Sequence, residues 1–300
     1  MKQKIRMLAQ KNYYSARFYY HLRLKREIAR QDQLILVYQM GKVGSSSVVR
    51  SLKARNFLTF NVHTFDPYYL NKDQQLYRKE FVAGSINAKT LWDELLFRKL
   101  LGCRFNGKPI KIITLVRDPV ARNISHFFQW PNMIMEQTTG KYHLRSPSFE
   151  YDEVFSTEGT EDKLAHLFMT QFKRHGRPLI WLDQELKHHF GIDAYSHDFP
   201  KEKGYAIYRE GNIKAMLIKL EKLSEAAGEA FRNFLGIESF QLVPANVGRK
   251  KNTSDLYKRF LNSIKLPPDY LDTMYKSRFA NHFYSRKEIE SFRTRWSRSA

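Results

Sequence analysis

The sequence predicts an α/β fold in which a central parallel β-sheet is flanked by helices and followed by a helical C-terminal region. Apolar runs at residues 34–38, 112–116 and 215–218 are bounded by polar residues, as is typical of strands buried on both faces. Helical apolar spacing follows each run. From residue 254 onward the apolar residues have helical spacing, and many of them are aromatic. Aromatic residues at helical spacing more often form a core than a ligand site.

Positive charge is the strongest feature of the composition. The chain has 51 Lys and Arg against 30 Asp and Glu, a formal net charge of +21. Such an excess favours an anionic partner, whether a nucleotide, an acidic glycan, a nucleic acid or an anionic membrane. The single cysteine, Cys103, excludes an intrachain disulfide framework and favours a reducing compartment. We therefore expect a cytoplasmic protein, either free or peripheral at the inner face of the cell membrane.

Residues 1–31 form a basic leader that we expect to be helical and to precede a single α/β domain at residues 32–300. The leader has nine Lys and Arg residues, opposed only by Glu27, with apolar residues interleaved among them. One interpretation is an amphipathic helix that lies on an anionic membrane. The other is a helix that packs on the domain through Phe18, Tyr19 and Leu22.

The first motif, LILVYQMGKVGSSSVV at residues 34–49, combines a predicted strand, a glycine-containing turn and a helix start. In this geometry backbone N–H groups and the positive end of the helix face an anion. Lys42 adds a positive charge, and its position differs from that in a Walker A loop. Gly41 and Gly44 allow close backbone approach, and hydroxyl donors come from Ser45, Ser46 and Ser47. The motif predicts a phosphate site, or else a serine-rich helix cap beside a solvated lysine.

The second motif is the predicted strand and helix of residues 112–128. Arg117 leaves the end of the strand, Asp118 suits a helix N-cap and Pro119 suits the first helical turn. Ser125 follows two turns later, so Arg117 and Ser125 can converge on one anion. The alternative is that Arg117 pairs with Asp118 or another nearby carboxylate.

Together the two motifs resemble the sulfotransferase family that uses 3′-phosphoadenosine 5′-phosphosulfate. That family has a Lys-x-Gly-Ser/Thr-Ser/Thr core, matched here by residues 42–46, and later an Arg followed eight residues on by a Ser. The resemblance covers roughly residues 32–295 and is strongest to a bacterial branch of capsular polysaccharide synthesis proteins. It implies a P-loop-like sulfotransferase fold and no metal. It also implies that the first motif, including Lys42, binds the 5′-phosphosulfate, while Arg117 and Ser125 bind the 3′-phosphate.

The resemblance also implies a catalytic base and a late basic loop. His63 ends the predicted strand at residues 57–63 and could take the proton of the acceptor hydroxyl, since its unperturbed pKa lies near neutrality. Glu80 is the rival, because some branches use a glutamate. Arg249 and Lys250 could fold over the 3′-phosphate, although the family's glycine follows its basic pair and here Gly248 precedes it. A solvated basic turn is the alternative for that loop.

Three further segments carry weaker expectations. Residues 130–162 are rich in Pro, Gly, Ser and Thr and could cover the site and select the acceptor. Residues 240–243 could form an edge strand that ends at Pro244. Five histidines have no metal-ligand spacing, so we expect surface or structural roles for them: His166, His175, His188, His189 and His197.

Three functions compete on this evidence. The first is sulfuryl transfer from the nucleotide donor to a hydroxyl or amine of a neutral or anionic glycan, such as a capsular or other surface polysaccharide. The second is a P-loop-like, nucleotide-dependent phosphotransferase, against which stands the position of Lys42. The third is a nucleic-acid-binding protein, which the net charge suggests but no nucleic-acid motif supports. We expect the first function and no nucleic-acid partner.

Overall fold

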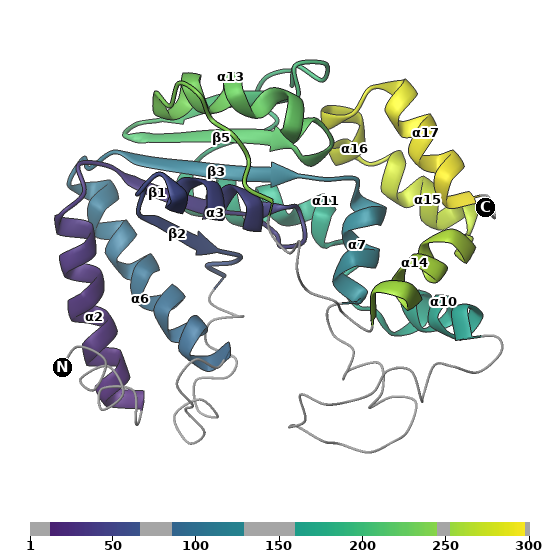
Figure 1. Ribbon diagram of the computed structural model, residues 1–300, viewed down its shortest axis with the longest axis horizontal. Coiled ribbons are helices and arrows are strands. Elements are labelled where there is room, and N and C mark those ends of the chain that lie inside the picture. The colour runs from purple at the N-terminus through teal and green to yellow at the C-terminus, as the bar shows by residue number, and fades with distance from the viewer. Residues whose placement is uncertain (1–12, 67–85, 129–159, 245–252, 298–300) are drawn as a thin grey trace.

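The computed structural model describes residues 13–66, 86–128, 160–244 and 253–297 (Figure 1). Five strands form one sheet in the order β2-β1-β3-β5-β4. The neighbours β2, β1, β3 and β5 run parallel, and β4 is antiparallel to β5. The predicted α/β fold with a central parallel sheet is confirmed. The strands are β1 (Leu34–Tyr38), β2 (Thr59–Val62), β3 (Ile110–Val116), β4 (Tyr205–Glu210) and β5 (Ile213–Lys219).

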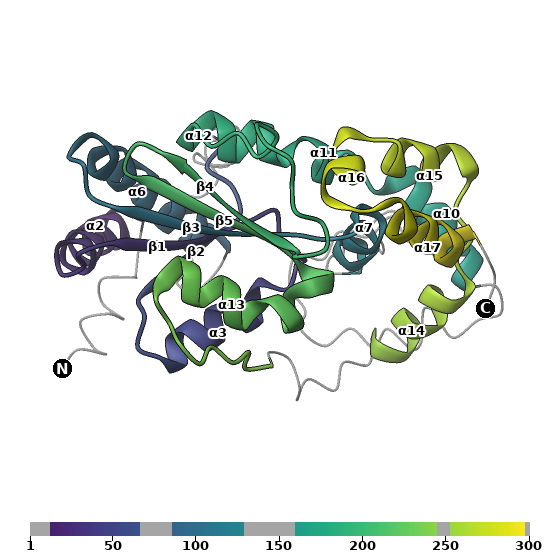
Figure 2. The same ribbon diagram turned by 90° about the horizontal axis from the view of Figure 1, so that it is seen from above.

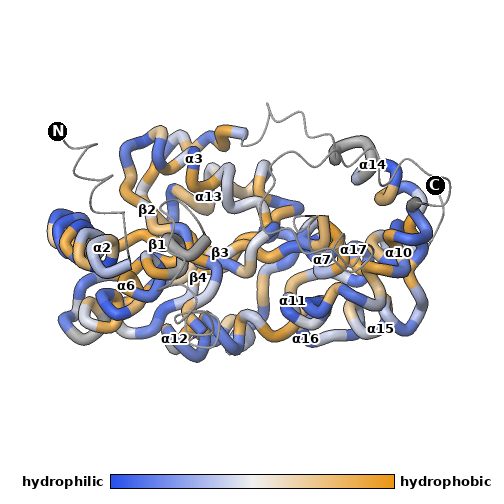
Figure 3. The backbone as a smooth tube through the Cα atoms, turned by 90° about the horizontal axis from the view of Figure 1, so that it is seen from below, coloured by the Kyte–Doolittle hydropathy of each residue, from blue (hydrophilic) through white to orange (hydrophobic). Residues whose placement is uncertain are grey.

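The connection between β4 and β5 explains the one antiparallel pair. Only two residues, Gly211 and Asn212, separate these strands, and a parallel pair needs a crossover of a dozen or more residues. The parallel strands are instead joined by segments that contain helices. β1 is buried along its whole length and β3 nearly so, which agrees with their continuous apolar sequences (Figure 3).

Helices cover both faces of the sheet (Figure 2). On one face lie α3 (Ser45–Ala54) and α13 (Leu223–Leu235). The other face carries α6 (Ile86–Phe105), α11 (Arg177–Trp181), the π-helix η1 (Leu182–Lys187) and α12 (His188–Phe190). From β1 the chain first adds β2 along one edge of β1 and then crosses over to add β3 along the opposite edge of β1. Such a reversal opens a crevice at the carboxyl ends of the strands, where α/β proteins bind ligands.

The described part of the leader, α2 (Tyr13–Ala29), packs against α6 beside the sheet (Figure 1). Tyr20 meets Trp92 edge to face, with ring centroids 5.5 Å apart. Packing on the domain is therefore correct for α2. Of the three expected contact residues, Tyr19 is half-buried and packs against the core, and the other two are wrong. Phe18 and Leu22 are exposed. The buried face consists of Tyr13, Ala16, Tyr20, Leu24 and Ile28.

The C-terminal region is helical, as predicted, and forms a second apolar core together with two earlier helices. Several of its aromatic residues are buried in this core, among them Phe260, Tyr275 and Trp296, whereas Phe279 is buried in the core around the sheet. None of the helices in the described part of the chain is long and apolar enough to span a membrane. The helices that contribute to the second core are α7 (Pro119–Phe127), α10 (Thr160–Gln171), α14 (Thr253–Ser263), α15 (Pro268–Tyr275), α16 (Arg278–Phe283) and α17 (Arg286–Ser297).

Asp118 joins the C-terminal helices to the end of β3. Its buried carboxylate caps α7 by accepting from the Val120 N–H at 3.0 Å. The same Oδ1 accepts from the Tyr275 hydroxyl at 2.8 Å, and Oδ2 accepts from the Trp296 indole N–H at 3.0 Å. Burial raises the pKa of Asp118, while these donors oppose that shift. One side chain therefore starts α7 and anchors both α15 and α17.

The end of β5 is anchored in a similar way. The ammonium of the fully buried Lys219 bonds Glu288 of α17 at 2.5 Å. Two residues on, the Glu221 carboxylate accepts from the Asp118 N–H at 2.8 Å and from the Tyr284 hydroxyl at 3.3 Å. The Lys219–Glu288 ion pair and the Tyr284–Glu221 hydrogen bond thus attach the C-terminal helices to the carboxyl edge of the sheet.

The expected strand at residues 240–243 is wrong. The backbone there bonds side chains of α3 instead: Ser51 Oγ accepts from the Val243 N–H at 2.7 Å, and Arg50 donates to the Pro244 carbonyl at 2.7 Å. Arg55 donates to the Ser239 carbonyl at 2.9 Å. These side-chain partners satisfy backbone groups that a strand would have paired with the sheet.

We predict that Asp118→Asn lowers the free energy of unfolding by about 1–3 kcal/mol. The amide Oδ1 can keep the bonds from Val120 and Tyr275, but its NH₂ faces the buried Trp296 N–H and leaves that donor unsatisfied. The control is Asp272→Asn, the same change on a partly exposed carboxylate bonded to Lys276 and Arg293, which should cost much less because solvent screens such surface pairs. Denaturant unfolding of the three proteins measures both effects, and equal losses would contradict the anchoring role of Asp118.

Candidate functional site

The segment between β1 and α3 contains three left-handed residues directly before the helix. Gly41, Lys42 and Gly44 have φ values of 81°, 63° and 86°. This conformation is routine for glycine and uncommon for lysine. A Cβ on Gly44 would also collide with the side chain of Leu220. Position 44 therefore favours glycine mainly because of its backbone conformation, and a larger residue would also have to displace the end of the Leu220 side chain.

The helix that follows presents its N-terminus at this turn. Gly44 occupies the N-cap of α3 and has no side chain to cap the N–H groups of the first turn. The helix dipole favours negative charge at the same place. The predicted serines differ in exposure. Ser45 is buried and its Oγ accepts from Gln39 Nε2 at 2.9 Å, whereas Ser46 is exposed and Ser47 is half-buried.

Two arginines bind the carbonyl groups of this turn. Arg117 Nη1 donates to the Lys42 carbonyl at 2.9 Å. The buried Arg122 of α7 donates to the Met40 carbonyl at 2.9 Å and to the Gly41 carbonyl at 3.4 Å. Arg117 thus supports the loop, a role that was not predicted for it. Its charge also lowers the pKa of Asp118 and Glu221, against a larger raising effect of burial.

Ser125 lies on α7 and is half-buried, two helical turns beyond Arg117 as the motif predicted. Three other predicted residues, Glu80, Arg249 and Lys250, fall outside the described residues. So does the whole of residues 130–159 in the expected insertion. The last three residues of the expected insertion, 160–162, lie in α10, which begins at residue 160.

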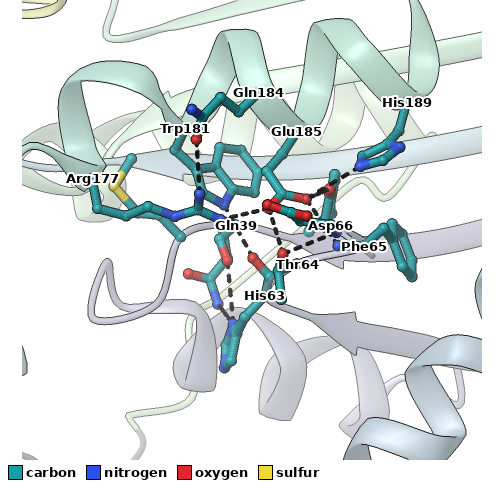
Figure 4. Close-up of polar contacts among 12 residues, drawn as sticks. Gln39, His63, Thr64, Phe65, Asp66, Arg177, Trp181, Gln184, Glu185 and His189 are labelled. Carbon is teal, nitrogen blue, oxygen red and sulfur yellow. Dashed lines mark hydrogen bonds and ion pairs between the residues drawn. The ribbon is translucent and has the colours of Figure 1, made fainter. Parts of the chain in front are cut away.

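Gln39 connects the turn to His63. The Gln39 side chain accepts from the Gly41 N–H through Oε1, and its Nε2 lies 2.9 Å from both Ser45 Oγ and His63 Nδ1 (Figure 4). Gln39 is fully buried, whereas His63 is exposed just past the end of β2. The predicted base therefore lies beside the predicted anion site, with one side chain touching both.

Gln39 offers His63 Nδ1 both a donor and an acceptor. Because the Gly41 N–H fixes Oε1, the amide presents Nε2–H to Nδ1, which favours the tautomer with its proton on Nε2. The Gln39 carbonyl also lies 3.2 Å from Nδ1 and suits the other tautomer. A base that acts through Nε2 must carry its own proton on Nδ1. The Gln39 carbonyl is positioned to accept that proton's hydrogen bond.

Glu185 holds the backbone that carries His63. It is fully buried on the π-helix η1, and its carboxylate accepts from the hydroxyls of Tyr38 and Thr64 and from the Phe65 N–H at 2.8 Å (Figure 4). Arg177 pairs with it at 2.5 Å. These donors come from three separate parts of the chain, so the carboxylate fixes the end of β1 and the segment after β2 relative to α11.

Two more contacts complete this support. The Trp181 indole N–H donates to the His63 carbonyl at 3.0 Å (Figure 4). His189 Nε2 lies 3.7 Å from Glu185 and burial lowers the pKa of His189. A π-helix is rare and frequently marks a functional site. Here it places Glu185 within reach of the segment that positions His63.

Positive charges gather around the turn. The pKa of Arg122 is lowered to about 9. Burial is the main cause, and the positive charges of Arg177, Arg174 and Arg117 contribute to the decrease. Burial likewise lowers the pKa of His126 to about 3, with Arg122, Arg174, Lys42 and His63 adding to the shift. His126 is therefore neutral near pH 7. Cations that disfavour one another in this way would be stabilised by a bound anion.

The other histidines for which surface or structural roles were expected lie either on the surface or in the packing of the domain. His175 lies 2.9 Å from the Tyr270 hydroxyl and 2.9 Å from the Phe168 carbonyl, which is the structural role expected of it. His188 and His197 are exposed. Within the described ranges of the chain, no three His, Cys, Asp or Glu residues are arranged to hold a metal ion.

Gln39, Arg122 and Glu185 are the residues that sequence reasoning missed. Gln39 is a polar residue directly after a buried strand, a position that could have attracted notice. Arg122 lies inside the second motif, five residues after Arg117. Nothing in the local sequence around Glu185 indicates that it is buried.

One comparison with known proteins gives a match. Residues 160–285, less than half of the chain, match the family described as "Putative capsular polysaccharide synthesis protein". No curated protein and no solved structure gives a significant match. The matched segment contains Arg177, Trp181 and Glu185, which support His63, and also the anchoring residues Lys219 and Tyr275. The glycine-containing turn and Arg117 lie outside it. The chain is thus similar to a capsular polysaccharide synthesis family from α10 to just beyond α16.

Proposed function

We propose that this protein is a sulfotransferase that uses 3′-phosphoadenosine 5′-phosphosulfate to sulfate a hydroxyl or amine of a glycan. One observation carries the proposal. The left-handed turn before α3 lies among Lys42, Arg117 and Arg122, so a helix N-terminus and several cations meet at one place. A dianionic or more highly charged group is the ligand that such an arrangement stabilises best.

The donor has two anionic groups, and the site offers cations from two elements. The turn and the first turn of α3 would bind the 5′-phosphosulfate through backbone N–H groups and the hydroxyls of Ser46 and Ser47. Arg117 and Ser125 would bind the 3′-phosphate. Arg117 is already oriented by its bond to the Lys42 carbonyl, so it would lose little freedom on binding. Arg249 and Lys250 remain candidates for a further contact with the 3′-phosphate.

The residues also fit the chemistry of transfer. The acceptor oxygen forms a new bond to sulfur while the bond between sulfur and the bridging oxygen of the donor breaks, leaving adenosine 3′,5′-bisphosphate. Lys42 would neutralise the charge that develops on this bridging oxygen. His63 would take the proton of the acceptor at Nε2 in the tautomer that donates Nδ1–H to the Gln39 carbonyl, which requires the Gln39 amide N–H to release Nδ1.

The glycan acceptor is supported by the family match at residues 160–285. The family's description concerns polysaccharide synthesis, and a sulfated or otherwise modified capsular or surface polysaccharide is a product of that class. The matched segment supplies Arg177 and Arg174, whose charges lie near Arg122. These two arginines could also accommodate an acceptor that is itself anionic.

We predict that the protein binds adenosine 3′,5′-bisphosphate and that Arg117→Ala weakens this binding by about 2–4 kcal/mol, or about 30- to 700-fold. Calorimetry should show a much smaller loss for adenosine 5′-monophosphate, which lacks the 3′-phosphate. Equal losses for the two ligands would mean that Arg117 acts only by holding the loop. Arg209→Ala removes an exposed arginine of β4 and serves as the control. Binding of ATP with magnesium but not of the bisphosphate would instead support a phosphotransferase.

We predict that Lys42→Ala reduces turnover about 10²- to 10³-fold while changing donor binding much less, because its charge matters most where charge develops. Transfer of labelled sulfate to a panel of bacterial polysaccharides measures turnover, and calorimetry measures binding. Lys53→Ala removes an exposed lysine at the other end of α3 and should leave both unchanged. Near-normal turnover of the Lys42 variant would rule out this role.

We predict that Gln39→Glu shifts the titration of His63 upward by about 1 pH unit, because a carboxylate replaces the amide beside Nδ1. The new carboxylate can still accept from the Gly41 N–H and can also accept from Ser45. If His63 is the base, it must be unprotonated to act, so the acid limb of the pH–rate profile should move to higher pH. NMR of the imidazole protons measures the titration, with the exposed His197 as an internal control. An unchanged titration of His63 would contradict the described contact.

A further inference from the structure

Exposed apolar side chains gather on one part of the surface. Among the described residues, six large hydrophobic side chains are exposed, and four of them lie on α2 and α6. Tyr14 is 69% exposed, Phe18 67%, Leu22 48% and Leu101 37%. Scattered exposed apolar residues are normal, but a cluster of them marks an interaction site. The other two, Ile180 and Ile207, lie elsewhere.

The cluster on α2 forms a stripe. Tyr14, Phe18 and Leu22 are spaced four residues apart, so they line one side of the helix. The core-facing side of α2 is formed by other residues, among them Tyr20 and Leu24. Hydrophobic and hydrophilic residues consequently alternate around α2 (Figure 3). The stripe is therefore surplus to the packing of this helix on the domain.

A groove runs from the stripe to α6. It has a volume of about 480 Å³, and Phe18 and Leu95 contribute apolar surface to it. Arg17, Arg98 and Lys99 lie on its walls. Apolar side chains flanked by cations in this way match the boundary between acyl chains and phosphate groups in a bilayer.

The charge of this groove is positive even after its ion pairs are counted. Glu94 pairs with both Arg17 at 3.3 Å and Arg98 at 3.1 Å, so one carboxylate serves two guanidinium groups. Lys25 and Arg26 add exposed positive charge on the same helix. A second copy of the chain, also with a net charge of +21, would be repelled by this face.

We propose that this face of α2 and α6 docks on an anionic phospholipid bilayer. Tyr14, Phe18 and Leu22 insert at the level of the headgroups, while Arg17, Arg98 and Lys99 contact lipid phosphates. The basic leader was expected either to lie on a membrane or to pack on the domain. In this proposal α2 does both, through different sides. The proposal is independent of the sulfotransferase activity, because vesicle binding needs neither donor nor acceptor.

The test is co-sedimentation of the full chain with vesicles of neutral phosphatidylcholine, alone or mixed with anionic phosphatidylglycerol. We expect binding to the anionic vesicles that weakens as salt rises, and little binding to the neutral ones. Replacing Tyr14, Phe18 and Leu22 together by Ser should lower the partition coefficient at least about tenfold. Thermal stability should stay unchanged, since these side chains are exposed. Deleting the leader is a poorer test, because it would remove five core residues of α2.

The matched control replaces Ile180 and Ile207 by Ser, which removes two exposed apolar side chains away from the groove. This variant should bind like the wild type. If the triple variant unfolds, Phe18→Ser alone provides the comparison, with a smaller loss expected. Wild-type protein that stays in the supernatant at low salt, or that binds neutral vesicles equally well, would overturn the proposal. So would equal binding by the Phe18 variant, or a wild-type dimer that the variant dissociates without any vesicle binding.

Discussion

Charged side chains buried at the carboxyl edge of the sheet must each find partners, and this requirement determines how the rest of the chain is arranged. Asp118, Glu185 and Lys219 are all almost completely buried. An unpaired charge in such a place would cost several kcal/mol, roughly, in free energy. Each of the three is paired with a group more than fifty residues away in the chain. The C-terminal helices and the π-helix are therefore held where they can supply these partners.

The carboxylates at this edge are used up in such contacts, while several cations remain close together. Arg122 illustrates the imbalance, because it donates to backbone carbonyls and to Asn123. Burial is the main cause of the lowered pKa values of Arg122 and His126, and neighbouring positive charges lower both further. An anion at the turn before α3 would offset these positive charges. The electrostatics of the fold and the proposed donor site thus have the same origin.

The family match divides the chain in an informative way. Residues 160–285 hold most of the supporting partners, namely Arg177, Trp181, Glu185, Glu221 and Tyr284, whereas the turn and Arg117 precede them. The matched part therefore supplies the side chains that hold the segment carrying His63 and the end of β3, whereas Arg117 and Arg122, which bind the turn, lie outside it.

Much of the fold was determined by local sequence patterns. Continuous apolar runs predicted β1, β3 and β5, and the helical spacing after residue 254 predicted the C-terminal helices. Gly41, Gly44 and the serines predicted the turn and the helix start, because a left-handed conformation and an uncapped N-terminus are properties of a few neighbouring residues. Tertiary structure alone decided which buried charges pair, which side of α2 faces the core, and that residues 240–243 bond to α3 rather than to the sheet. It also decided that Gln39 joins the turn to His63 and that Glu185 lies behind them. Such contacts join groups that are far apart in the chain. The spacing of apolar residues indicates which side chains are buried, but it does not indicate which side chain each of them contacts.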